Sequence, residues 1–181
     1  FLNEVAPRAG GVRDVAGQAE PWLELYNAGT AAVALDGWQL LASSTNTPWT
    51  FPQGLTLRPG ERRMVFLDGE TSQATPAEWH ASFRPAPDNG WIALARPSAV
   101  GSGVIDTFRY GTTPAGVSWA SIPEGQRIVR MAATPSPARA NPTAASMAPV
   151  VAARWTNPGL VVPWPSLRGA VYRLEASDNP A

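Results

Sequence analysis

Short apolar runs, each bounded by Gly, Pro, Asn or Asp, recur about every ten residues along most of this chain. The 19 Pro and 16 Gly residues reinforce this rhythm, because Pro lacks a backbone N–H and breaks helix interiors, while both residues favour turns. Helical periodicity is hard to find. The pattern therefore predicts an all-β fold, either a sandwich or a barrel.

The second apolar run, residues 22–27, alternates in the way a strand does. Trp22, Glu24 and Tyr26 are expected on one face and Leu23 and Leu25 on the other, as in a half-buried strand. The turns at 28–30 and 36–37 predict two hairpins, which join this strand to 33–35 and then to 38–42. Other strands are expected at 1–5, 49–51, 55–57, 62–67, 80–83, 91–96, 104–110 and 117–122.

Two longer connections interrupt these runs. The loop 7–20 is interpreted as too polar and irregular to be buried. The connection 68–78 is expected to lead into a short helical turn at 76–79 with Thr75 as its cap.

The composition changes after Arg130 to a stretch rich in Ala, Pro, Ser and Thr, which is typical of a domain end and a linker. We therefore predict one domain at 1–141, a linker at 142–149 and a partial second β module or packing extension at 150–181. The last segment holds candidate strands at 150–155, 160–164 and 170–176. Three short strands are too few to close a core alone.

Several motifs, taken in order, resemble the lamin-tail domain family. FLNEV at 1–5 is followed by EPWLELYN at 20–27 and LDGWQL at 35–40. The match continues through FPQG (51–54), LRPGE (57–61), WHASF (79–83), VIDTFRYG (104–111), VSWASIPEG (117–125) and TPSPARAN (134–141). The resemblance covers 1–141 and implies an immunoglobulin-like β-sandwich, which the strand rhythm fits.

The end of the chain carries a second resemblance. The segment 160–179, with its W-P-x-x-x-G-x-x-Y-x-x-E spacing, resembles the start of a fibronectin type III-like repeat. Bacterial members of the lamin-tail family commonly occur in secreted or surface multidomain proteins, so the resemblance implies an extracellular, periplasmic or cell-surface location. The chain starts at Phe1 without a signal-peptide layout, which suggests that a targeting segment has been removed.

The inventory of reactive side chains is small. Cysteine is absent, and His80, in a predicted strand near Phe83, is the only histidine and is interpreted as structural. Phosphate loops, nucleophile elbows and zinc-ligand spacings are absent from the sequence. We therefore predict no catalytic residues, no cofactor and no enzyme activity.

Acidic residues offer weak alternatives to that prediction. Glu4, Glu20 and Glu24 come close if the first two strands pair, and three carboxylates are candidate ligands for calcium. The favoured interpretation is that they accept hydrogen bonds, with Glu24 on a solvated face, and no metal site is predicted. In the same way Asp68, Glu70 and Asp88 are interpreted as turn residues rather than as glycosidase carboxylates. The loop 7–20 also lacks the acidic run often seen in the family, which weakens a cation site there.

Aromatic and basic residues supply the candidate interaction residues. Of the eight tryptophans, Trp22 and Trp38 are expected in the core. Candidates for partner contact are Trp49, Trp79 and Trp119, together with Arg58, Arg62 and Arg63 around the turn at 59–60. The formal net charge is zero, from 14 basic and 14 acidic residues, which disfavours nucleic acid as a partner.

The function predicted from these features is that of a non-catalytic structural or protein-interaction module of a secreted or cell-surface bacterial protein. A partner protein or neighbouring domain is expected to bind at loops or by strand addition at a sheet edge. The alternative is an accessory domain that binds carbohydrate, DNA or cell wall for an extracellular hydrolase. Several exposed tryptophans on one face or an Arg-lined concave face would favour that alternative. The sequence has no apolar stretch long enough for a membrane-spanning helix.

Overall fold

A computed structural model describes residues 1–97, 103–132, 134–142, 154–156 and 159–161. The chain divides into two compact units, Phe1–Ala148 and Pro149–Ala181. In the described residues, regular structure consists of strands and one 3₁₀ turn at Thr71–Gln73, so the predicted all-β class is confirmed. No helix in this part of the chain has the length and hydropathy to cross a membrane.

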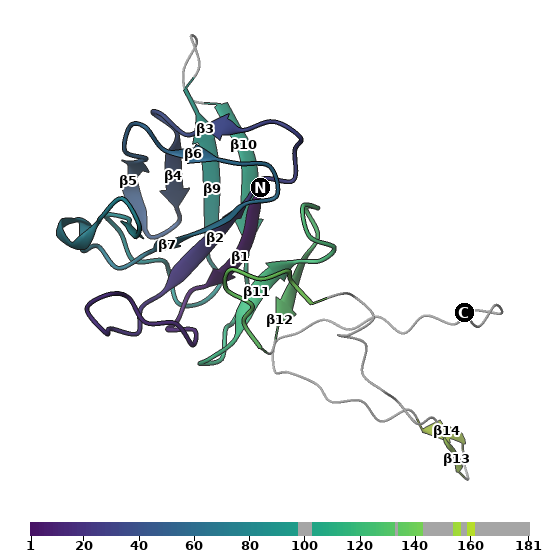
Figure 1. Cartoon of the computed structure of the whole chain (residues 1–181). Helices are drawn as coiled ribbons and strands as arrows, with labels where there is room; N and C mark the ends of the chain where they lie inside the picture. Colours follow the sequence, from purple (N-terminus) through teal and green to yellow (C-terminus); the bar gives the residue numbers. More distant parts are fainter. Residues whose placement is uncertain (98–102, 133, 143–153, 157–158, 162–181) are drawn as a thin grey trace. The chain divides into compact units, whose positions relative to one another are not determined.

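The larger sheet of the first unit has the strand order β12-β11-β1-β2-β7-β8, and β1 lies in its middle (Figure 1). Neighbouring strands are antiparallel except for β7 and β8, which are parallel. The strands are β1 (Leu2–Ala6), β2 (Trp22–Tyr26), β7 (Arg62–Phe66), β8 (Trp79–His80), β11 (Ser118–Ser121) and β12 (Val129–Ala132).

The smaller sheet has the order β10-β9-β4-β5. It contains β4 (Gln39–Ala42), β5 (Thr45–Thr50), β9 (Trp91–Arg96) and β10 (Gly103–Arg109). A two-stranded ladder joins β3 (Val33–Ala34) to β6 (Thr56–Leu57). In the second unit, β13 (Arg154–Thr156) pairs with β14 (Gly159–Val161).

The core lies between the two sheets, where alternate residues of each strand meet. Leu23 and Leu25 of β2 belong to the same buried cluster as Leu40 of β4 and Ile92 and Leu94 of β9. Each such side chain contributes roughly 1.5–3 kcal/mol when it leaves water. Two sheets packed over one apolar layer make the first unit an immunoglobulin-like β-sandwich, as predicted.

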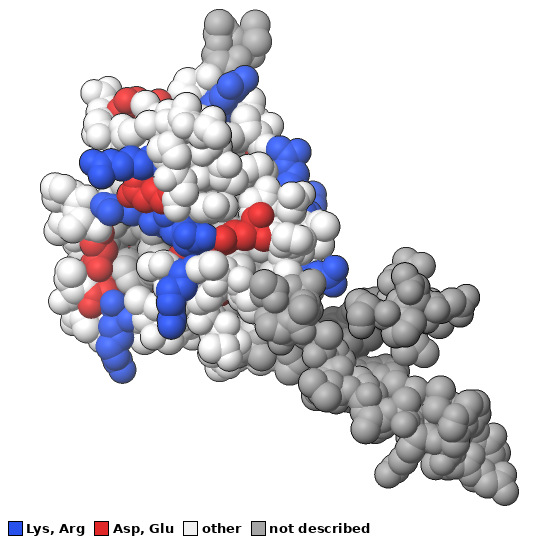
Figure 2. Space-filling view, turned by 45° about the vertical axis from the view of Figure 1, so that its right-hand side comes forward, with Lys and Arg blue, Asp and Glu red and all other residues white. Residues whose placement is uncertain are grey.

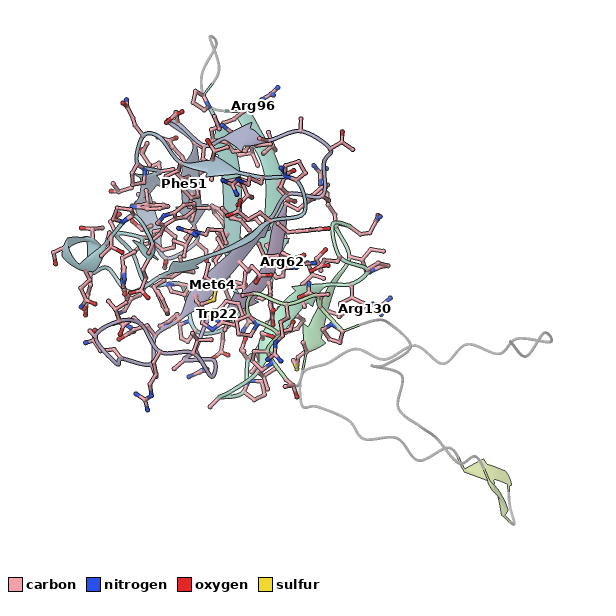
Figure 3. All side chains as sticks on the ribbon, in the orientation of Figure 1. Trp22, Phe51, Arg62, Met64, Arg96 and Arg130 are labelled. Atoms are coloured by element: carbon pink, nitrogen blue, oxygen red, sulfur yellow. The ribbon has the colours of Figure 1, made fainter. Side chains whose placement is uncertain are left out.

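Strand β2 is not half-buried, which corrects the sequence prediction. Its outward-facing Trp22 is fully buried with Ala6 and Phe66 in a second small apolar cluster, and Figure 3 shows it beside Met64. The loop 7–20 covers this side, since the Trp22 indole donates a hydrogen bond of 3.1 Å to the Gly10 carbonyl. A Cβ on Gly10 would lie only 2.6 Å from the Ala6 Cβ. The loop is therefore partly buried, contrary to expectation.

The two predicted hairpins are wrong, because β2 pairs with β1 and β7 while β3 pairs with β6. Turn residues mark where the chain reverses, but the pairing depends on which apolar faces meet in the sandwich. The helical turn lies at 71–73 rather than 76–79, although Thr75 Oγ1 does accept a hydrogen bond from the Glu78 amide. Strand β12 was not predicted at all.

The organisation of the chain's end stays a prediction. Residues 143–153 and 162–181 lie outside the described residues. The predicted linker, the predicted strand at 170–176, most of those at 150–155 and 160–164, and the fibronectin-like segment therefore lie outside the described structure.

Candidate functional site

The tryptophans predicted to contact a partner are mostly internal. Trp49 and Trp79 are 8% and 4% exposed, and both rings pack edge-on against Phe51, with centroids 4.6 and 5.9 Å away. Trp119 is partly buried and its indole donates to Thr113 Oγ1. The rings of Trp49 and Trp79 are buried in the core between the sheets. These two residues are therefore core residues and are not exposed for contact with a partner. As expected, Trp22 and Trp38 pack in or against the core.

The three candidate arginines do not form one basic patch. Arg62 forms an ion pair with Glu124, and its guanidinium lies 4.5 Å from the centre of the Tyr26 ring. Arg63 instead lies over the Trp79 ring, at 4.8 Å, while Arg58 is exposed at the turn. Basic and acidic side chains are interspersed on the face shown in Figure 2.

Glu4 and Glu24 are direct cross-strand partners on β1 and β2, and both are fully buried. They are covered by residues 134–142, which we call the strap. Glu4 accepts hydrogen bonds from the Ser118 hydroxyl and from the Ser136 amide and hydroxyl. Glu24 accepts hydrogen bonds from the Asn3 side chain and, at 2.6 Å, from the Ala138 amide.

A third carboxylate, Glu124, completes this arrangement. It pairs with Arg62 and also accepts hydrogen bonds from the Asn3 side chain and the Asn141 amide. Three acidic side chains therefore hold the strap against the sheet. The prediction that Glu24 lies on a solvated face is wrong, because the strap excludes water from it.

Burial governs the protonation of these groups. It raises the pKa of Glu4 above its ordinary value and raises the pKa of Glu24 to about 7. For Glu124, burial acts in the same direction, but the hydrogen bonds from Arg62 and Asn3 outweigh it and lower its pKa. One buried carboxyl of the cross-strand pair is thus poised to hold a proton near neutrality.

Glu20, the third carboxylate of the calcium alternative, lies apart from this pair. It forms a 2.5 Å ion pair with Arg84. The three glutamates therefore do not converge on one point, and Glu4 and Glu24 have hydrogen-bond donors from the fold itself. This arrangement does not match a calcium site, which needs six to eight oxygen ligands around one ion.

His80 lies at the centre of a different cluster. Its Nδ1 is 2.6 Å from Asp68 Oδ2 and its Nε2 is 3.1 Å from Glu78 Oε1, while its ring stacks on Phe66 at 5.3 Å. Burial lowers the pKa of His80, but the hydrogen bonds with Asp68 and Glu78 prevail and raise it. Asp14 of the loop 7–20 joins this group, with ligand atoms of Asp14, Asp68 and His80 all within 4.8 Å of one another.

The carboxylates interpreted as turn residues do bond to backbone amides. Asp68 Oδ1 accepts a hydrogen bond from the Glu70 amide, and Asp88 Oδ1 accepts one from the Thr113 amide. Asp88 also pairs with Arg8, and its pKa is lowered, chiefly by the Thr113 amide. Ligand atoms of Asp68 and Asp14 lie within 4.8 Å of each other, but both residues are buried and do not flank an open cleft of the kind that glycoside hydrolysis requires.

The edge strands of the smaller sheet are blocked against strand addition. On β10, Asp106 accepts hydrogen bonds from the Leu2 and Thr107 amides, and Arg127 donates to the Ile105 carbonyl. On β5, Pro48 has no amide hydrogen, and the Thr47 amide bonds to Thr45 Oγ1. Proline and inward charges are common protections of sheet edges.

An apolar pocket of about 240 Å³ opens where β2 ends between the sheets. Its main polar side chain, Asn27, is saturated, because its amide donates to the Ala31 and Leu57 carbonyls and its oxygen accepts from the Gly29 amide. The lining residues are Phe1, Leu25, Tyr26, Asn27, Ala28, Gly29, Val33, Leu35, Trp38, Leu57, Leu94 and Ile105. A second, more polar groove of about 320 Å³ is lined by Trp91 together with Leu41, Ala42, Ser43, Thr45, Asn46 and Pro48.

Sequence reasoning missed the pocket and the role of Asp14. The pocket is assembled from segments far apart in the chain, so no local pattern marks it. Asp14 lies 54 residues before Asp68, in a loop interpreted as unburied. One sequence signal could have indicated this role: Asp14 is an isolated carboxylate in a loop that precedes the strongly apolar strand β2.

Comparison with known proteins places this fold in a family. A family model described as Lamin Tail Domain matches residues 1–112, which is more than half of the 181 residues. No curated protein matches the chain. Strands β11 and β12 and the strap lie beyond the matched residues, although they complete the larger sheet. The strand pattern, the sandwich and this match together show that the chain belongs to the lamin-tail domain family, a family of immunoglobulin-like protein-interaction domains.

Proposed function

We propose that this chain is a non-catalytic protein-interaction module of a secreted or cell-surface bacterial protein. A partner protein inserts one apolar side chain into the pocket at the end of β2. Membership of a family of interaction domains supports the general role. The secreted, bacterial context rests on the family resemblance alone.

The apolar pocket is the observation that carries this proposal. Ligand pockets for small molecules and cofactors usually have volumes of roughly 300–1,000 Å³, and this one holds about 240 Å³. Its size suits a single aliphatic or aromatic side chain. Because the side chain of Asn27 already forms its hydrogen bonds within the fold, a ligand in the pocket would be bound mainly by burial of apolar surface.

The engagement of the acid and base groups supports a non-catalytic role. A general base needs a free position from which to reach a substrate proton. Both ring nitrogens of His80 face carboxylates, and Glu4 and Glu24 hold the strap. These groups stabilise the fold instead of facing an open cleft.

The observations favour the accessory-domain alternative less. Stacking on sugars uses exposed aromatic rings, and none of the six tryptophans between residues 1 and 142 is exposed. Trp91 is the half-buried ring that lines the more polar groove. A single partly covered ring is a weak sugar platform, and the arginines are scattered.

The proposal is tested by placing a charge at the pocket. We expect the full chain, immobilised and exposed to extracellular and surface proteins of its source organism, to retain a specific protein. Val33→Glu should abolish this binding, because Val33 lines the pocket and burial of a carboxylate there is costly. Val33→Thr, which keeps the side-chain shape but adds a hydroxyl, should weaken binding without loss of folding.

Val15→Glu is the matched control, since Val15 is 73% exposed and lies outside the pocket. It should bind the same protein as the unmodified chain. Retention of the partner by a folded Val33→Glu variant would contradict the pocket assignment. Turnover by the purified chain on a panel of hydrolase substrates would contradict the non-catalytic role.

A further inference from the structure

The cluster around His80 brings together three separate parts of the chain. Asp14 comes from the loop 7–20, Asp68 follows the end of β7, and His80 lies on β8. All three are at least nine-tenths buried, at 6%, 4% and 1% exposed. Their ligand atoms lie within 4.8 Å of one another.

This spacing is close to that of metal ligands. Zinc binds imidazole nitrogen and carboxylate oxygen at roughly 2.0–2.2 Å, so two ligands of one ion lie at most about 4.4 Å apart. A common ion would take the place of the proton in the 2.6 Å hydrogen bond between His80 Nδ1 and Asp68 Oδ2. These two atoms would move apart, while the most widely spaced ligand atoms, now within 4.8 Å, would approach by a few tenths of an ångström. The pairing of β7 with β8 fixes the backbone of His80, and the Gly69 amide, next to Asp68, donates a hydrogen bond to the Ala81 carbonyl.

The charges of the cluster are unbalanced. Asp14 forms no ion pair among the described residues, and its hydrogen bonds come from neutral groups, the backbone amide and the side-chain amide of Gln18. The nearby Arg84 is directed to Glu20 and Glu70. Among the described residues, His80 is the one direct ion-pair partner of Asp68 and Glu78, and Arg84 acts on Asp68 only at longer range. A buried carboxylate without a cation is costly, which points to a missing positive charge.

We infer that Asp14, Asp68 and His80 bind one divalent transition-metal ion, with Zn²⁺ as the best match. This goes beyond the proposed interaction role and does not depend on it. A mixed set of one imidazole and two carboxylates suits zinc or manganese, whereas calcium prefers six to eight oxygens. Glu78, whose Oε1 accepts a hydrogen bond from the Val15 amide, lies on the other side of the ring and orients it.

The ion would connect the loop 7–20 to the β7–β8 edge of the larger sheet. The loop lies over Trp22, which donates a hydrogen bond to Gly10. A second hydrogen bond, from the Val15 amide to Glu78, already attaches the loop next to β8. A metal that binds the folded chain more tightly than the unfolded chain stabilises it by mass action. In this role the ion stabilises the fold, and the inference differs from the sequence prediction of no metal site.

The test uses the full, tag-free chain, in which His80 is the only histidine. Zn²⁺ is titrated into the metal-free protein and followed by calorimetry and by ¹⁵N resonances of the one imidazole. We expect one ion per chain, a large shift of one ring nitrogen and a higher melting temperature. Asp14→Asn should weaken binding about tenfold or more, while calcium at the same concentration should not compete.

Asp36→Asn is the control, since Asp36 is an exposed turn residue bonded to the Gly54 amide; it should bind zinc as the unmodified chain does. If Asp14→Asn fails to fold, His80→Gln provides the second variant, because its amide can still bond to Asp68. Unchanged imidazole resonances at stoichiometric zinc would overturn the inference. So would zinc binding that survives in both Asp14→Asn and His80→Gln.

Discussion

Glu24 lies on the outward face of β2, yet water does not reach it. Alternation along the strand places it opposite Leu23 and Leu25, where a charged residue of an open sheet meets solvent. The strap and Asn3 cover the carboxylate instead and donate hydrogen bonds to it. Burial raises its pKa to about 7, so the folded chain holds this proton more tightly than the unfolded chain.

This shift predicts a pH dependence of stability. The contribution of Glu24 is complete below the ordinary glutamate pKa near 4.5 and is lost as the pH rises through about 7. The unfolding free energy of the unmodified chain should fall between pH 5 and 8. In Glu24→Gln this fall should be smaller by up to about 3 kcal/mol. Urea unfolding at four pH values measures this, and a residual slope is expected from Glu4, whose pKa is also raised. Parallel curves for both proteins would contradict it.

At the scale of elements, the strap covers one face of the larger sheet although it is not a strand. It has no partner in either sheet, but its polar groups bond to residues of β1, β2 and β11. Asn141 is central, since its side-chain amide donates to the carbonyls of Asn3 and Ser121, and its oxygen accepts from the Ser136 hydroxyl. The strap thereby closes the outer face of the larger sheet over Glu4 and Glu24.

Asn141→Ala is expected to destabilise the domain by about 2 kcal/mol, because it leaves buried carbonyls without donors. Chemical denaturation of the variant and the unmodified chain provides the measurement. Arg139→Ala is the control within the same element, since Arg139 is exposed; its unfolding free energy should change by less than about 0.5 kcal/mol. Equal effects of the two substitutions would show that the strap is not held through Asn141.

At the scale of the whole molecule, the position of β1 decides what can be removed. It lies between β2 and β11, so the first strand of the chain needs a partner from residues beyond the 1–112 match. Ser118 of β11 also bonds to buried Glu4. The matched segment alone lacks one neighbour of β1, the strap and a cover for two buried carboxylates.

Truncation tests this dependence. A chain of residues 1–148, the first compact unit, should unfold cooperatively at a melting temperature within a few degrees of the full chain. A chain of residues 1–112 should lack a cooperative transition, because its buried carboxylates and sheet edge are exposed. Circular dichroism melts and dispersion of amide resonances distinguish the two. A stable 1–112 chain would show that β11 and the strap are dispensable.

The sequence by itself determined the local features of this protein. Apolar runs and turn residues predicted nearly all the strands of the first unit, and the ordered motifs from FLNEV to TPSPARAN predicted the family and the immunoglobulin-like sandwich. These features depend on neighbours within a few residues, where alternation and backbone preferences act. Strand β12 was not predicted, because its sequence VRMA is short and borders a Pro-rich stretch.

Tertiary structure alone decided the candidate sites. Glu24 is buried because residues more than a hundred positions later cover it, and Trp49 and Trp79 are internal because both pack against Phe51. Asp14, Asp68 and His80 meet through sheet pairing and a covering loop, and the apolar pocket draws on both sheets. Such contacts depend on which surfaces fold together, which no local pattern of residues records.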